Sequence, residues 1–142
     1  MENTTLKPGE YWTITRLIYW YLDRHRSQQA ERLARGLLEL NGGDGLAWKY
    51  YGEARRQQGD LDGAVQSFGR ATQFRPDDDE AWLRYGETLL RLGRRDEASQ
   101  ALEHARERTK GAGRRRRVDA LLRLCGTQKR PQPRQEASDH GW

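Results

Sequence analysis

Apolar side chains recur three and four residues apart along most of the chain, as they do on one face of an α-helix. Between residues 45 and 112 they form runs of about 14 residues, and within each pair the two runs are divided by a short break rich in glycine and aspartate, at 59–62 and at 93–96. Two amphipathic runs joined by such a break predict two antiparallel helices. The pattern therefore predicts an all-α protein made of helical hairpins.

These hairpins repeat in the sequence at an offset of 34 residues. Without a gap, the offset pairs Trp48 with Trp82, Tyr51 with Tyr85, Gly52 with Gly86, Gly59 with Gly93, Ala64 with Ala98, Phe68 with Leu102, and Ala71 with Ala105. The same step backwards reaches a degenerate first copy, whose apolar positions are Ile14, Leu17, Ile18, Tyr21, Ala30, Ala34 and Leu37. We therefore expect three repeats, at about 11–44, 45–78 and 79–112, stacked as a solenoid.

Two glycines stand in the middle of predicted helices, where glycine costs about 1 kcal/mol relative to alanine. Gly52 and Gly86 therefore need a packing reason, and we expect the second helix of each hairpin to approach closely there. Ala64 and Ala98 are the expected small partners on that second helix.

The ends of the hairpins carry signals of their own. In the first repeat His25 takes the place of the glycine that separates the two helices in the other repeats. Pro76 and the aspartates at 77–79 are expected to end one hairpin and to cap the next helix, which is a simpler explanation of the aspartates than a cation site.

A further amphipathic stretch follows the third repeat. An apolar stripe at helical spacing comes after the run of arginines at 114–117, and it consists of Val118, Leu121, Leu122, Leu124 and Cys125. We expect a capping helix at 114–125 that buries Leu121 and Leu122 and completes a domain spanning 1–125. The proline- and charge-rich composition of 126–142 predicts a disordered basic tail.

The repeated residues resemble the pattern of the tetratricopeptide repeat (TPR) family, which has Trp, Leu or Tyr, Gly, Gly, Ala, Phe, Ala and Pro at this spacing. The middle repeat matches nearly throughout, and the third departs from the pattern at Leu102 and Lys110. The resemblance implies a curved solenoid that binds other proteins on its concave side, which the first helix of each repeat lines.

Mapped residue by residue, that concave face consists of Trp12, Thr15, Arg16 and Tyr19, then Lys49, Tyr50, Glu53 and Arg56, then Leu83, Arg84, Glu87 and Arg91. Large aromatic residues and arginines often anchor protein partners. We therefore expect a groove for an extended peptide or an amphipathic helix. For Trp12 and Tyr19, packing in an N-terminal core is an equally good interpretation.

Two uses of such grooves are known in the family. One is a clamp of Lys and Asn pairs that binds the C-terminal carboxylate of heat-shock chaperones. Lys49 matches one clamp position, but Glu53 and Arg84 stand where the clamp has asparagines. These two replacements argue against a clamp. The layout is also similar to that of the small three-repeat chaperones of type III secretion, which are cytoplasmic and hold a segment of a secreted subunit. This similarity rests on size, a leading helix, a single trailing helix, and residues 93–98.

Charge adds an alternative function. The net charge is +5, and residues 112–142 account for all of the excess, with eight basic and three acidic groups. Binding of nucleic acid through 114–117 and 129–130 is therefore the second hypothesis, although a solvated helix start explains the arginine run better. Elsewhere the two signs alternate, as on solvated helices.

No catalytic or metal-binding motif is found, so we expect a protein that is not an enzyme and has no cofactor or metal. His25, His104 and His140 are scattered, and the single Cys125 is expected to be a buried apolar residue.

No apolar run is long enough to cross a membrane, and the first five residues lack the features of an export signal, so we expect a cytoplasmic protein. The sequence does not indicate an oligomeric state.

Overall fold

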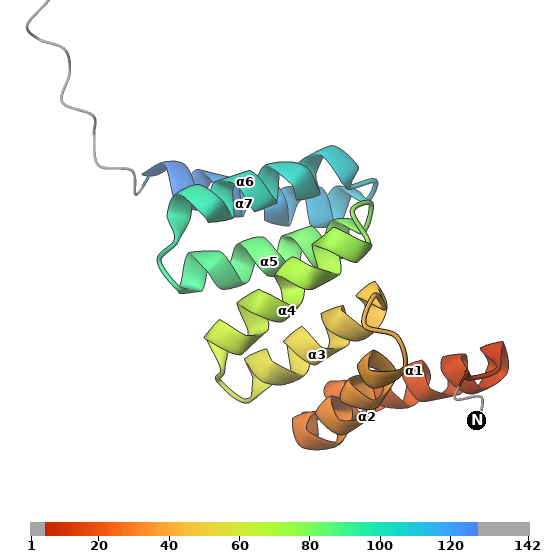
Figure 1. Ribbon diagram of the computed structural model, residues 1–142. Coiled ribbons are helices and arrows are strands. Elements are labelled where there is room, and N and C mark those ends of the chain that lie inside the picture. The colour runs from red at the N-terminus through yellow and green to blue at the C-terminus, as the bar shows by residue number, and fades with distance from the viewer. Residues whose placement is uncertain (1–4, 128–142) are drawn as a thin grey trace, which may run out of the picture.

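The computed structural model describes residues 5–127, and within this range every regular element is a helix, as predicted. The elements are α1 (Pro8–Asp23), α2 (Ser27–Leu40), α3 (Gly45–Gln57), α4 (Leu61–Phe74), α5 (Asp79–Arg91), α6 (Arg95–Arg108) and α7 (Ala112–Thr127). The first six form three antiparallel hairpins, one for each expected repeat, and α7 packs on α6 as the seventh (Figure 1).

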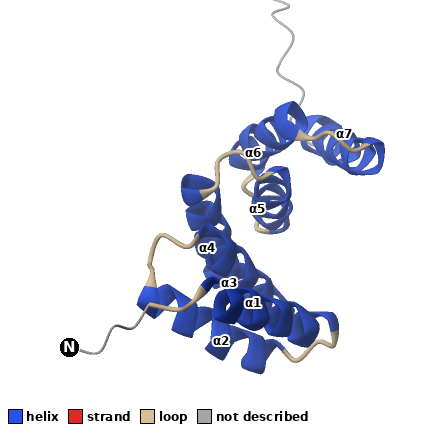
Figure 2. Cartoon of the chain, turned by 90° about the vertical axis from the view of Figure 1, so that its right-hand side faces the viewer, coloured by secondary structure: helices blue, strands red, loops and turns tan. Residues whose placement is uncertain are grey.

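The hairpins stack so that each second helix lies between two first helices. α2 contacts α3 and α4 contacts α5, while α1 also touches α3 and α5 touches α7. Figure 2 shows the resulting stack, with α6 and α7 at one end and α1 and α2 at the other. The helices α1, α3, α5 and α7 therefore share one side of the solenoid.

Close helix packing explains the two mid-helix glycines. A Cβ built on Gly52 would lie 2.8 Å from the ring of Phe68, and one built on Gly86 would lie 2.7 Å from Leu102. The expected close approach is confirmed, but the side chains that fill the space are Phe68 and Leu102 rather than Ala64 and Ala98. The two alanines are buried nearby, and Ala98 faces Gly86 only through its backbone oxygen, at 3.4 Å.

The turns within the hairpins require a left-handed backbone. Gly59 and Gly93 have φ of 81° and 77°, and His25, at the equivalent position, has φ of 56°. Glycine adopts this conformation freely, whereas a residue with a Cβ is strained in it. The sequence alignment of His25 with the two glycines is therefore confirmed in the backbone.

Aspartates begin the first helices of the second and third repeats. The side chain of Asp44 caps α3 by accepting a hydrogen bond from the backbone N–H of Ala47, at 3.0 Å. Asp78 caps α5 in the same way through Ala81, at 3.2 Å. Of the three aspartates after Pro76, Asp78 is thus the cap, as the sequence predicts for this stretch.

The end cap differs in detail from the expected one. α7 begins at Ala112, two residues before the predicted start, and it buries Val118 and Cys125 in the same core cluster as Leu89 and Leu102. Leu121 and Leu122 pack at the edge of this cluster and are only partly buried, while Leu124 is 48% exposed. Val118 and Cys125 are seven residues apart and so lie on one side of the helix, which is the side that faces the third repeat. Nearly all of the predicted tail at 126–142 lies outside the described residues.

Candidate functional site

Three hollows follow the side of the solenoid that α1, α3, α5 and α7 share. The aromatic hollow, of about 430 Å³, is lined mainly by α1. The central hollow, of about 290 Å³, lies among α1, α3 and α5. The α7 hollow, also about 290 Å³, lies between α5 and α7. Tyr19 and Tyr50 line both of the first two, and Glu80 and Arg84 line both of the last two, so the three hollows form one row, here named the inner groove.

The N-terminal end of the inner groove is open and aromatic. Trp12 is 58% exposed and Tyr19 is 61% exposed, so both are surface residues rather than members of an N-terminal core. Trp20 is also exposed, and the guanidinium of Arg24 lies over its ring at 4.0 Å from the centroid. Tyr50 is more buried than these, and this burial raises the pKa of its hydroxyl. These rings offer contact area to an apolar group without any rearrangement of the core.

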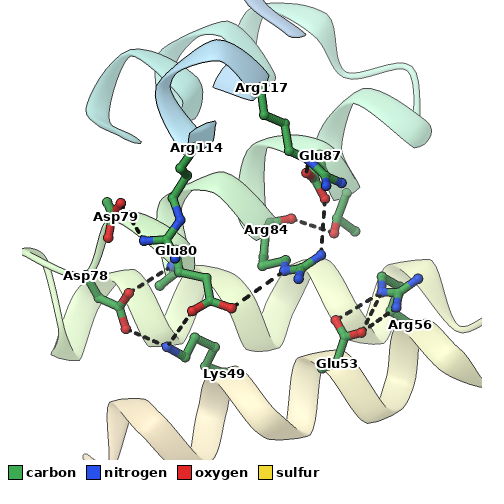
Figure 3. A network of polar contacts seen from close by, with 12 residues as sticks. Lys49, Glu53, Arg56, Asp78, Asp79, Glu80, Arg84, Glu87, Arg114 and Arg117 are labelled. Carbon is green, nitrogen blue, oxygen red and sulfur yellow. Dashed lines mark hydrogen bonds and ion pairs between the residues drawn. The ribbon is translucent and has the colours of Figure 1, made fainter. Parts of the chain in front are cut away.

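The centre of the groove is charged, but its charges are paired with one another (Figure 3). The Nζ of Lys49 lies 2.8 Å from Oδ2 of Asp78 and 3.6 Å from Oε2 of Glu80. Glu53 forms a close ion pair with Arg56 on the same helix. These groups neutralise each other, so an incoming charged group would have to break an existing pair in order to bind here.

Asp78 shows the strength of this pairing. Its burial alone would raise the pKa of the carboxyl group, but the hydrogen bond and charge of Lys49, with the backbone N–H of Ala81, bring the pKa below its ordinary value. Lys49 and Asp78 are 14% and 10% exposed, so water screens their interaction poorly. The Lys49 ammonium is therefore held by the chain's own carboxylates.

At the third hollow, α7 is tied to α5 by two ion pairs. Arg114 donates to Asp79 at 2.7 Å, and Arg117 donates to Glu87 at 2.6 Å (Figure 3). The hydroxyl of Thr109 donates to the same Asp79 carboxylate at 3.0 Å. Half of the arginine run at 114–117 is thus engaged within the protein.

The structure brings together most of the residues expected on the concave face. Among the residues lining the inner groove are Trp12, Thr15, Arg16, Tyr19, Lys49, Tyr50, Glu53, Arg56 and Arg84. Glu87 lies beside them through its ion pairs with Arg84 and Arg117, at 3.6 Å and 2.6 Å.

The structure differs from the expectation at three positions. Leu83 lines the α7 hollow but is 4% exposed and belongs to the C-terminal core. The reason is that α7 lies against this part of α5 and covers it. Thr15 lines the aromatic hollow but is 3% exposed, and its hydroxyl donates to the backbone oxygen of Trp12 at 3.0 Å. Arg91 lies at the C-terminal end of α5 and lines none of the three hollows.

The sequence mapping missed several lining residues, and Trp20, Glu80 and Arg114 are three of them. Trp20 and Glu80 lie four residues from Arg16 and Arg84, so helical spacing alone could have placed them on the same face. Arg114 could not have been found in this way, because its position depends on how α7 packs.

Between residues 5 and 127 no three side chains of His, Cys, Asp or Glu are grouped so that they could hold a metal ion. In the same range no helix combines the length and the apolar character that crossing a membrane requires.

Comparison with known proteins gives a family match along most of the chain. Two models described as tetratricopeptide repeat match it, one at residues 55–125 and the other at residues 17–79. No curated protein matches the chain in sequence.

Solved structures of similar fold include two type III secretion chaperones. The translocator chaperone SycD of Yersinia enterocolitica is 19% identical, with a TM-score of 0.81 over 88% of this chain and 89% of that chain. PcrH of Pseudomonas aeruginosa, solved in complex with the chaperone binding region of PopD, is also 19% identical, with a TM-score of 0.81 over 92% of this chain and 100% of that chain. The TPR2B domain of yeast Sti1, in complex with an Hsp70 peptide, is 16% identical, with a TM-score of 0.72 over 81% of this chain and 95% of that chain. At these identities the similarity concerns the fold.

Proposed function

The chain belongs to the tetratricopeptide repeat family, and from this premise we propose that it is a noncatalytic chaperone or adaptor that holds a protein partner in the inner groove. The partner segment is an extended peptide or an amphipathic helix. Members of the family are protein-interaction modules, and the repeats supply the scaffold rather than the specificity.

The observation that carries the proposal is the pair of tyrosines shared by the aromatic and central hollows. Tyr19 is 61% exposed and Tyr50 closes the floor beside it, so the two rings present apolar area in a concave setting. The flanking charges of Lys49, Glu53 and Arg56 are already paired within the chain. An occupant is therefore held by apolar anchors, and the paired charges set the polar rim around them.

The partner we propose is a subunit secreted by a type III apparatus, with the chain acting as its chaperone in the cytoplasm. Support comes from the similarity to SycD and PcrH along nearly the whole described solenoid. A carboxylate clamp is less well supported despite the similarity to the Sti1 domain, because Lys49 is bound to Asp78 and Glu80 and Glu53 stands at an asparagine position. We do not propose nucleic-acid binding, because Arg114 and Arg117 are bound to acidic side chains. The other positions expected for it, 129–130, lie outside the described residues.

The test uses peptides selected for binding to the intact chain from a random-peptide phage library. The selected peptide is labelled, and its dissociation constant is measured by fluorescence anisotropy for the wild type and for Tyr19→Ala/Tyr50→Ala/Arg84→Ala. We expect selection of peptides with apolar anchors and a loss of affinity of about tenfold or more in the triple variant, since a central anchor contributes more than about 1–2 kcal/mol. Tyr19→Ala alone, at an exposed position, should give part of this loss without any effect on folding.

The matched control is Glu39→Ala/Glu103→Ala, at two exposed positions on second helices. It should bind the peptide as the wild type does. Equal affinity of the triple variant and the control, with circular dichroism unchanged in both, would contradict the groove. For the proposed partner, co-expression with each secreted translocator subunit of the native organism should give a co-purifying complex that the triple variant loses.

A further inference from the structure

The 34-residue offset makes five positions at the two junctions between successive repeats equivalent, and four of the five carry different residues. At the first junction these positions are mostly polar, and at the second they are mostly apolar. The equivalent pairs are Glu31 and Val65, Arg35 and Gly69, Tyr51 and Tyr85, Arg55 and Leu89, and Gln58 and Leu92.

At the first junction a polar network fills the space between α2 and α3. Glu31 is 9% exposed and accepts from Arg35 at 3.0 Å, from Arg55 at 2.9 Å and from Gln58 at 2.9 Å. Arg55 also donates to the hydroxyl of Tyr51 at 2.6 Å. The long side chain of Arg35 and its partners thus close this junction.

At the second junction the same place is a hollow of about 600 Å³ between α4 and α5, here named the outer hollow. Gly69 has no side chain to fill it, and the nearest atom to a Cβ there would be a ring carbon of Tyr85, at 3.1 Å. Val65 and Trp82 add apolar surface beside Tyr85, while Gln66, Thr72 and Gln73 give the hollow polar walls. The Tyr85 hydroxyl has no hydrogen bond among the described residues, in contrast to Tyr51.

Two arginines stand on the rim of the outer hollow. Arg94 is held by Glu97 through two hydrogen bonds, of 3.0 and 2.6 Å. Arg70 is exposed and makes no ion pair or hydrogen bond within residues 5–127, so its guanidinium is free for an external anion. The apolar surface of Trp82 and Tyr85 beside a free guanidinium is complementary to an apolar side chain next to a carboxylate.

The outer hollow is separate from the inner groove. Trp82 and Tyr85 lie on the side of α5 opposite to Arg84 and Glu87, because successive residues of a helix are rotated by about 100°. The two surfaces share no lining residue. A ligand in the outer hollow therefore leaves the inner groove accessible.

We propose that the outer hollow is a second peptide-binding site, which accepts an apolar side chain flanked by an acidic residue. The apolar side chain packs on Val65, Gly69 and Tyr85, and the acidic one pairs with Arg70. A protein with two such sites can hold its partner and be bound by a second protein at the same time. The inference does not depend on the function proposed for the inner groove.

The test is a titration of the isotope-labelled chain with N-acetyl-Asp-Leu-Leu-Asp-amide, followed by amide and indole chemical shifts. We expect saturable shifts within residues 65–73 and at the Trp82 indole, and none with N-acetyl-Lys-Leu-Leu-Lys-amide. Gly69→Arg places in the outer hollow the residue type that Arg35 has at the first junction. It should fill the hollow and abolish the shifts. Arg70→Glu should weaken binding of the acidic peptide by roughly threefold to tenfold, as expected when one exposed ion pair is replaced by repulsion.

The matched control is Arg32→Glu, which makes the same charge change at an exposed position of α2. It should bind the acidic peptide as the wild type does. Shifts of equal size with both peptides, or shifts that persist in Gly69→Arg, would overturn the site. If the phage-selected peptide still binds the inner groove of Gly69→Arg, the variant is folded and the function proposed for the inner groove stands. Loss of binding in the outer hollow is then distinguished from failure of the proposed function.

Discussion

Arg117 on α7 donates from Nε to Oε1 of Glu87 on α5, at 2.6 Å and across 30 residues of sequence. Glu87 is 14% exposed and also lies 3.6 Å from Arg84, so it stands between a cation of the cap and a cation of the inner groove. Together with the pair of Arg114 and Asp79, this contact fixes one wall of the α7 hollow.

Removing these two ion pairs should loosen the cap only slightly. Both arginine side chains are exposed, at 43% and 59%, so Arg114→Ala/Arg117→Ala should lower the free energy of unfolding by no more than about 1 kcal/mol in total. The loss should shrink at high salt. Urea denaturation measures it, and Arg115→Ala/Arg116→Ala is the control that should stay at the wild-type value. Equal losses in the two variants would mean that the pairs do not hold α7.

Two glycines in helices should respond to alanine with opposite signs. The Cβ of Gly52→Ala would lie 2.8 Å from the buried ring of Phe68, so overpacking should cost about 1–3 kcal/mol. Gly36 in α2 has nothing within 4 Å of its Cβ position, so Gly36→Ala should stabilise by up to about 1 kcal/mol through helix propensity. Thermal melts compare them directly, and a shift of the same sign in both would contradict the packing described for the hairpin.

The strained turn of the first repeat should be relieved by glycine. His25 has φ of 56°, where a side chain is unfavourable, so His25→Gly should raise the free energy of unfolding by about 0.5–1 kcal/mol. His25→Ala keeps a Cβ and serves as the control without this gain. A calorimetric melt in which alanine stabilises as much as glycine would show that the backbone conformation is not the cause.

The cap should depend on Val118 more than on the leucines beside it. Val118 is fully buried, so Val118→Asp places a charge in the core and should cost about 3 kcal/mol or more and promote association of the exposed third repeat. Leu124→Asp, at a position 48% exposed, should cost far less. Leu121→Asp/Leu122→Asp should fall between the two, since both leucines are partly buried. Size exclusion beside each melt checks the order, and a neutral Val118→Asp would mean that α7 is not a cap.

The Lys49 and Asp78 pair should make stability depend on acid. Because the folded protein holds the pKa of Asp78 below its ordinary value, the pair contributes stability above the unfolded pKa of about 3.9 and loses it as the pH falls through the folded pKa. Asp78→Asn keeps a capping side chain but cannot titrate, so its stability should fall less between pH 5 and pH 2. Urea midpoints across that range measure the difference, and parallel curves would show that other carboxylates account for the acid sensitivity.

The repeat period was enough to predict the helices, the hairpins and the equivalence of His25 to the turn glycines, because each of these depends on residues close together in the sequence. Mapping from the family resemblance placed Trp12, Tyr19, Tyr50 and Arg84 on the concave side, where helical spacing keeps them together on the first helices. It could also have added Trp20 and Glu80, which lie one turn away from residues already chosen.

Packing between distant segments decided the rest. Leu83 is buried because α7 covers that part of α5, and Val118 replaces Leu121 and Leu122 as the centre of the cap because of how α7 is rotated on α6. The ion pairs of Arg114 and Arg117 join residues 35 and 30 positions apart. A periodic pattern shows which side chains share a helix face. It does not show whether a neighbouring helix covers that face, pairs with its charges or leaves a hollow beside it, because these outcomes depend on contacts between helices that are distant in sequence.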